Sequence, residues 1–192
     1  MTAASPVGEL ASGRTCGSCG MCCKLLHIAP LDKPPHTWCS HFVADHGCGI
    51  HGRHPKVCKV FRCRWLDDEL LGEEWRPDRC GFVIHWSQSA VGLWINVDLE
   101  RCGAWRSEPY YSQIKRWSEM VRHGTGVVAV TEGDLRFVIF PEQDLPVSPG
   151  SSKAAITAGY RRQPGWRQPF ARIKRKDGSV EEFVGVPIPE LR

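Results

Sequence analysis

The sequence predicts an α+β protein in which a loop-rich, metal-organised cysteine cluster packs on a small strand–strand–helix–strand–strand unit. Two observations predict this fold class. Eight of the ten cysteines lie between Cys16 and Cys63, in a stretch that is punctuated by Gly and Pro and has no long apolar periodicity. Residues 81–140, by contrast, combine runs rich in Val, Ile and Trp with one helical pattern. Because the first stretch cannot bury much apolar surface, we expect bound metal to organise it.

Changes in composition divide the chain into four segments. Residues 1–15 are small and polar and predict a flexible N-terminus. Residues 16–80 form the cysteine-cluster module, 81–145 the α+β unit, and 146–192 a Pro/Gly-rich basic tail that ends in a hairpin. Within the module, residues 64–71 (RWLDDELL) predict one short helix that ends before Gly72.

The α+β unit begins with two β-rich runs, residues 81–86 and 91–99, which predict two strands across a short turn. Ser107 is a candidate N-cap of the helix that follows. The apolar residues of this helix recur at helical spacing, at Tyr110, Ile114, Trp117 and Val121. Residues 127–131 and 135–140 then predict a hairpin.

The C-terminal tail combines a predicted loop with a basic segment. Residues 141–169 contain five prolines and predict a loop, whereas residues 171–184 predict a hairpin that turns at Lys176-Asp177-Gly178. The segment 151–176 holds eight Lys and Arg and no Asp or Glu, while the rest of the chain has 17 basic and 21 acidic side chains. Such asymmetry is typical of a surface that contacts an acidic protein or RNA. We favour the simpler interpretation of a solubilising tail, because no RNA-binding module surrounds it.

The compartment bears on the chemistry of the cysteines. The N-terminal residues show neither the basic region nor the apolar region of a signal peptide, and no apolar run approaches the roughly 18–20 residues of a membrane span. We therefore expect a cytoplasmic protein that has no membrane contact. Because cytoplasmic thiols are kept reduced, the ten cysteines favour metal binding over a disulfide framework.

The cysteine spacing identifies the candidate ligands. Two thiolates separated by two residues reach one metal from a tight turn, and this spacing occurs twice in succession in CGSCGMCC, where Gly17 and Gly20 allow the backbone to fold closely. The candidate metal ligands are all the cysteines of the cluster, namely Cys16, Cys19, Cys22, Cys23, Cys39, Cys48, Cys58 and Cys63. Cys80 and Cys102 stand apart and are interpreted as small buried hydrophobic residues.

Several arrangements of these ligands remain open. In one arrangement, the eight cysteines form two four-thiolate sites. In the other, cysteines form one such site, and His and solvent complete a second site. His51 and His54 are the histidines considered as further ligands. Because neighbouring side chains tend to point apart, Cys22 and Cys23 are expected to have different roles. Either they bind two different metals, or one of them faces the core. The metal is zinc or the iron of an iron–sulfur cluster.

The pattern resembles the CxxCxxCC (YkgJ-type) cysteine-cluster family, whose members are described as zinc- or iron-chelating proteins. The resemblance rests on CGSCGMCC (16–23), Cys39, GCGIH (47–51) and HPKVCKVFRC (54–63), and it covers about residues 16–65. The family usually has an aromatic residue where His51 stands, and Arg-Pro where His54-Pro55 stands. A cluster of this type also occurs in flagellin lysine methylases, which implies an iron–sulfur cluster and favours [4Fe–4S] over zinc.

The sequence assigns no catalytic residue and no organic cofactor. The nucleophile motif G-x-S-x-G, a P-loop and the radical-SAM spacing C-x3-C-x2-C are all absent from the sequence. The acidic run Asp67-Asp68-Glu69 is interpreted as a solvated helix face. A redox or group-transfer enzyme, a structural zinc module and a metal-handling protein therefore remain as candidate functions.

Overall fold

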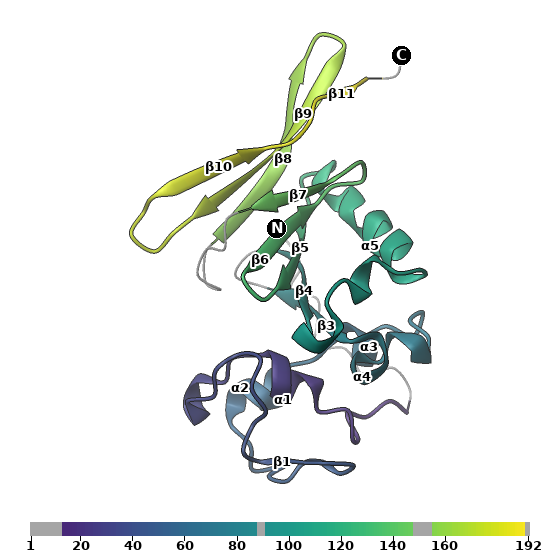
Figure 1. Ribbon diagram of the computed structural model, residues 1–192, viewed down its shortest axis with the longest axis vertical. Coiled ribbons are helices and arrows are strands. Elements are labelled where there is room, and N and C mark those ends of the chain that lie inside the picture. Colours follow the sequence, from purple (N-terminus) through teal and green to yellow (C-terminus); the bar gives the residue numbers. More distant parts are fainter. Residues whose placement is uncertain (1–12, 88–90, 148–154, 191–192) are drawn as a thin grey trace, which may run out of the picture. The chain divides into compact units, whose positions relative to one another are not determined.

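The computed structural model describes residues 13–87, 91–147 and 155–190 (Figure 1). Helices account for 25% and strands for 35%, which confirms the predicted α+β class and gives it a larger share of strand. The chain divides into two compact units, Met1–His85 (unit 1) and Trp86–Arg192 (unit 2), so the boundary falls within strand β3. Within the described residues, no helix is long and apolar enough to cross a membrane.

Unit 1 is built from very short elements. Its α-helices are α1 (Met21–Leu25), α2 (Lys56–Val60), α3 (Arg64–Asp67) and α4 (Pro77–Cys80). Two 3-10 turns, η1 (Ala29–Leu31) and η2 (Glu73–Trp75), and a two-residue ladder between β1 (Phe42–Val43) and β2 (Gly47–Cys48) complete the unit. Isolated helices of this length are unstable in water, so tertiary contacts must hold them.

The helix predicted over residues 64–71 is shorter than expected. α3 ends at Asp67, and Asp68 is extended, with φ −118° and ψ 104°. The Asp68 carboxylate accepts a hydrogen bond from the Leu70 N–H (3.1 Å), which favours a turn over a further helical residue. The guanidinium of Arg14 donates to the main-chain oxygens of Trp65 and Asp68 and lies over the Trp65 ring, so these carbonyls have partners outside the helix.

The main sheet has the strand order β3-β4-β5-β6-β7. Its strands are β3 (Phe82–Ser87), β4 (Gly92–Val97), β5 (Val127–Glu132), β6 (Leu135–Ile139) and β7 (Asp144–Val147). β4 and β5 pair in parallel through a crossover that contains the 3-10 turns η3 (Leu99–Arg101) and η4 (Ala104–Arg106) and helix α5 (Tyr110–Ser118). β5, β6 and β7 are antiparallel, which confirms the predicted hairpin.

Helix α5 begins later than its predicted N-cap. Pro109 occupies the cap position instead of Ser107, and the last turn is the 3-10 turn η5 (Glu119–Val121). Ile114 is fully buried, and Lys115 Nζ donates to the main-chain oxygen of Phe140 (2.8 Å) and to the carboxylate of Asp144 (2.7 Å). These contacts fix the helix on the sheet through β6 and β7.

The loop predicted over residues 141–169 is wrong in part, because it contains β7 and β8 (Ala155–Gln163). Two of its prolines are compatible with strands. Pro146 lies on the edge strand β7, where a missing N–H is tolerated, and Pro164 lies in the turn between β8 and β9 (Trp166–Lys174). The predicted C-terminal hairpin is confirmed, since β9 pairs antiparallel with β10 (Val180–Val184); β11 (Ile188–Pro189) also pairs with β9.

One core cluster of unit 2 lies between the main sheet and the β8–β9 pair. β8 and β9 contribute Ile156, Ala171 and Ile173, which pack with Ala129 and Val138 of the main sheet. Figure 1 shows the long β8–β9 pair, in green and yellow, with β10 alongside it. The alternation of β8 and β9 therefore places one face of each strand in the core.

The basic segment is largely paired with carboxylates. Glu182 on β10 lies opposite Arg172 on β9 and pairs with both Arg172 (2.7 Å) and Arg161. Arg175 pairs with Glu181 (2.5 Å), and Arg167 with Glu142 (2.6 Å). Exposed pairs stabilise a fold by only about 0–1 kcal/mol each. Their consequence here is that much of the positive charge seen in the sequence is matched by acidic residues outside the segment.

Candidate metal centre

The eight cysteines of the predicted cluster all belong to unit 1 and come from separate pieces of the chain. Cys16 and Cys19 lie on a turn, Cys22 and Cys23 on α1, Cys39 on a loop, and Cys48 at the end of β2. Cys58 lies on α2, and Cys63 immediately precedes α3. Cys39 and Cys63 are buried, Cys16 is exposed and the others are half-buried, and all are free thiols.

The first four cysteines share one compact backbone arrangement. The N–H of Cys19 donates to the oxygen of Cys16 (3.1 Å), and that of Cys23 donates to the oxygen of Gly20 (2.8 Å). Gly20 has a positive φ of 58°, and a Cβ there would lie 2.0 Å from the Phe42 ring. Only glycine therefore allows the Phe42 ring to lie against this turn.

Two further contacts bring distant loops to the same turn. The N–H of Cys39 donates to the oxygen of Cys23 (3.1 Å), which joins the loop of Cys39 to α1. A Cβ at Gly47 would lie 2.2 Å from the main-chain oxygen of Gly17, so the loop that carries Cys48 packs directly on the Cys16–Cys19 turn. Glycine at position 47 is therefore a condition for assembling the cluster.

We expect Gly47→Ala to destabilise unit 1 more than Gly52→Ala does. The two glycines have nearly equal φ angles, 86° and 87°, but a Cβ at Gly52 has nothing within 4 Å. Gly52→Ala therefore costs only backbone strain of about 1–2 kcal/mol, whereas Gly47→Ala adds a clash of about 1–3 kcal/mol. Urea unfolding followed by tryptophan fluorescence measures both, and equal losses in the two variants would contradict the packing described above.

Electrostatic interactions link the thiols across these segments. Burial raises the pKa of the Cys16 and Cys58 thiols, and both are raised further by Cys23 and Cys48. Burial also raises the pKa of Cys63 to about 12, with added effects from Cys16 and Cys19. Cys39 acts on Cys58 in the same way. The eight thiols thus form one electrostatically connected group, in which a nearby cation would favour the thiolate forms.

Main-chain N–H groups point at two of the sulfurs. Those of Met21 and Asp78 lower the pKa of Cys19, although burial outweighs them and raises it overall. Those of Leu66 and Trp65 have the same effect on Cys63. Hydrogen bonds of this kind stabilise a charged sulfur.

Cys22 and Cys23 do not point apart, so the expectation that they do different jobs loses its structural basis. The two thiols share a hydrogen bond, which raises the pKa of Cys22 and lowers that of Cys23. Both lie on α1, where adjacent side chains are separated by about 100° around the helix axis and so do not point in opposite directions. The pair can therefore act together.

Lys33 is the residue of this region that the sequence did not single out. Its side chain is buried, and its ammonium donates to the main-chain oxygens of Lys24 (2.8 Å) and Leu26. Burial lowers its pKa, while Cys23, Cys39 and Cys22 act in the opposite direction, so the ammonium lies near these thiols. No periodicity in the surrounding APLDKPP distinguishes this lysine, and only the tertiary structure places it.

The thiols are close enough to interact but do not form a coordination shell as they stand. Among the residues that the structure describes, no group of three or more His, Cys, Asp or Glu side chains is arranged to hold a metal ion. His51 and His54 stack with ring centroids 5.0 Å apart, and His54 Nδ1 accepts a hydrogen bond from the Gly52 N–H (2.9 Å). His54 therefore has a local role in its own loop.

The two remaining cysteines differ from each other. Cys80 is fully buried, as predicted, and its Sγ donates to the main-chain oxygens of Phe82 (3.2 Å) and Trp75 (3.5 Å). Cys102 belongs to unit 2 and is exposed, so its interpretation as a buried residue is wrong. It follows the 3-10 turn η3, and its Sγ donates to the main-chain oxygen of Leu99 (3.2 Å).

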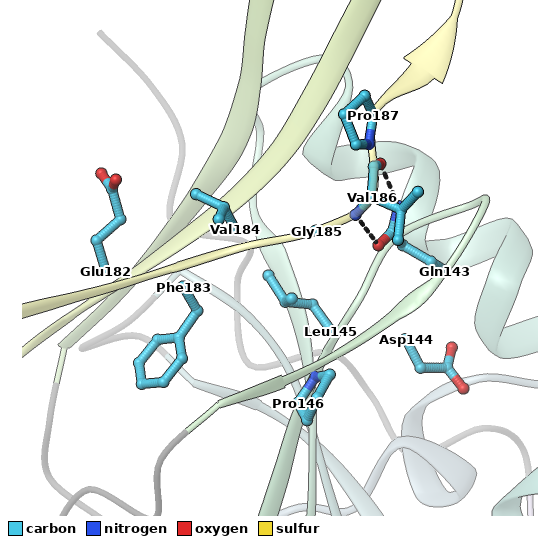
Figure 2. A pocket seen from close by; sticks show the side chains of 10 residues that line it. All are labelled: Gln143, Asp144, Leu145, Pro146, Glu182, Phe183, Val184, Gly185, Val186 and Pro187. Atoms are coloured by element: carbon cyan, nitrogen blue, oxygen red, sulfur yellow. Dashed lines mark hydrogen bonds between the residues drawn. The ribbon is translucent and has the colours of Figure 1, made fainter.

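Unit 2 contains a groove whose lining includes no cysteine. Figure 2 shows it between β7 on one side and β10 with the loop that follows it on the other. The Gln143 side chain pairs there with the main chain of Val186 through two hydrogen bonds of 2.9 Å. Its lining residues are mixed in character, namely Gln143, Asp144, Leu145, Pro146, Glu182, Phe183, Val184, Gly185, Val186 and Pro187. The groove presents no cluster of nucleophiles and no set of metal ligands.

The chain matches no protein-family model, no curated protein and no solved structure. The chemistry of the cysteine group is therefore the basis on which a function can be argued.

Proposed function

We propose that unit 1 binds metal through its cysteine thiolates, as an iron–sulfur cluster or as zinc. The observation that carries this proposal is the convergence of eight thiols from separate segments into one electrostatically connected group. Thiolates are soft ligands that suit zinc and iron–sulfur clusters. The formation of an apolar core, by contrast, does not require eight cysteines in so few residues. The occurrence of a similar cysteine cluster in flagellin lysine methylases favours [4Fe–4S].

The ligands of the proposed centre are the cysteines of the predicted cluster, namely Cys16, Cys19, Cys22, Cys23, Cys39, Cys48, Cys58 and Cys63. The first ligands to bind are Cys16, Cys19 and Cys22, because they lie together on one turn and the start of α1. Since no three of them form a metal-holding group as described, coordination requires the loops or side chains to adjust. An iron–sulfur cluster would supply one-electron chemistry, and Lys33 would offset the negative charge of the thiolates.

The same thiols support a cytoplasmic location. All ten cysteines are free, so no disulfide joins them. A thiolate metal centre needs reduced cysteines, and the cytoplasm keeps thiols reduced. We therefore infer that the protein works in that compartment.

Purification of the full chain without oxygen, followed by metal and sulfide analysis, tests the proposal. We expect a brown protein with iron and acid-labile sulfide in equal amounts and a thiolate-to-iron absorption band. A colourless protein that contains tightly held zinc would support the zinc form instead. Absence of iron, sulfide and zinc, both after purification and after reconstitution with each metal, would overturn the proposal.

A further inference from the structure

A buried arginine in unit 2 has unpaired guanidinium nitrogens within the described residues. Arg136 lies on β6 and is only 4% exposed, and burial lowers its pKa. Its Nε and Nη1 atoms have no hydrogen-bond acceptor in the part of the chain that the structure describes. A buried charge without a partner is strongly destabilising, so such a group calls for an explanation.

The neighbours of Arg136 on this face of the sheet carry further unpaired donors. Trp94 and Asn96 of β4 lie two residues apart, so both point to one face of the strand. Through β5, Asn96 is in register with Thr131 and Arg136, so the same face of β6 carries Arg136. The indole nitrogen of Trp94 and the amide nitrogen of Asn96 are both buried and, within the described residues, have no acceptor.

The arginine side chain extends toward these donors. β4 and β6 are separated by β5, which corresponds to about 10 Å between their backbones. The Arg136 Cζ nevertheless lies 5.5 Å from the centre of the Trp94 ring. The Arg136 and Trp94 side chains therefore meet on this face of the sheet.

The carboxylate of Glu132, next to this row of residues, faces away from these donors. Glu132 follows Thr131 on β5, but it points to the other face, where its Oε2 accepts from the Gly103 N–H (2.8 Å) and the Trp105 indole (3.2 Å). Every unpaired atom in the group is a donor, and one of the three side chains is positively charged. The missing partner is therefore an acceptor that carries negative charge.

We propose that this face of the unit 2 sheet binds an oxyanion, a carboxylate or phosphate group, held by Arg136 together with Asn96 and Trp94. A guanidinium forms two parallel hydrogen bonds with such groups, and the two neutral donors complete the shell. This ligand site is independent of the metal centre. The oxyanion comes from a small molecule in solution.

Calorimetric unfolding of the full chain in phosphate or acetate, against chloride at equal ionic strength, tests the site. At an anion concentration ten times the dissociation constant, we expect the midpoint of unit 2 to rise by about 3–6 °C. Arg136→Met is expected to lose this rise, whereas Arg175→Met, which removes an exposed and paired arginine, is expected to keep it. Asn96→Leu retains Arg136 and is expected to weaken the anion response. It replaces Arg136→Met as the test variant if Arg136→Met does not fold.

A rise of the midpoint in phosphate or in acetate that Arg136→Met removes supports the oxyanion site. The proposal is overturned if Arg136→Met and the unmodified chain respond equally, or if the unmodified chain responds to neither phosphate nor acetate.

Discussion

Cys19→Ser is expected to lower the affinity of unit 1 for metal by more than about tenfold, since even partners outside the coordination shell contribute about 10–100-fold. Cys19 lies between Cys16 and Cys22 on the turn that brings the first thiols together, and main-chain N–H groups of Met21 and Asp78 point at its sulfur. A serine hydroxyl at this position is a poor ligand for iron or zinc. Metal content per protein, measured after purification without oxygen, gives the result.

Two cysteines serve as matched controls for this substitution. Cys80→Ser changes a buried cysteine of the same unit, and the serine hydroxyl can still donate to the carbonyls of Phe82 and Trp75. Cys102→Ser changes an exposed cysteine of unit 2. Both variants are expected to retain the metal stoichiometry of the unmodified chain. If either loses as much metal as Cys19→Ser, the division between cluster cysteines and the other two is wrong.

Removal of the metal is expected to unfold residues 16–63 while the main sheet of unit 2 stays folded. Besides cysteine, the only buried apolar side chains in this stretch are Met21, Leu25 and Ile28. Its helices have at most five residues, and its strands have two. Because packing and helix formation contribute so little, we expect the proposed metal binding to supply folding free energy on the order of 10 kcal/mol.

Hydrogen exchange with and without a chelator measures this effect. The amides of residues 16–63 are expected to lose their protection when the metal is removed. Those of β4, β5 and β6 serve as the internal control, because Ile95, Val128, Val130 and Val138 are completely buried and their strands are paired on both sides. Equal protection of residues 16–63 in both states would show that the cysteine module folds without metal.

Local sequence patterns predicted most of the elements in unit 2. The runs at residues 81–86 and 91–99, the helix around Ile114 and the hairpin over residues 127–140 all occur, with shifts at their ends. These elements are visible in the sequence because alternation and helical spacing record which side chains face the core. The loop expected over residues 141–169 failed because prolines on an edge strand and in a turn resemble those of a loop.

No local sequence pattern indicates which distant strands pair with each other. The parallel pairing of β4 with β5 depends on a crossover of about thirty residues, and the ion pairs of the basic segment depend on β10 returning beside β9. Arg136 is a further case, since a charged residue in a strand normally predicts an exposed position. Its burial beside Trp94 follows from the order of three strands, which no local pattern encodes.

The sequence by itself determined which residues of unit 1 are candidate metal ligands, because ligand spacing is a local property of a turn. The repeated two-residue spacing from Cys16 to Cys22 predicts the first of these ligands without knowledge of the fold. Only the tertiary structure decided that the later cysteines join them, through the packing of Gly47 on Gly17, and that Lys33 lies among the thiols. Such contacts join residues far apart in the chain, so they depend on how loops close rather than on any one segment.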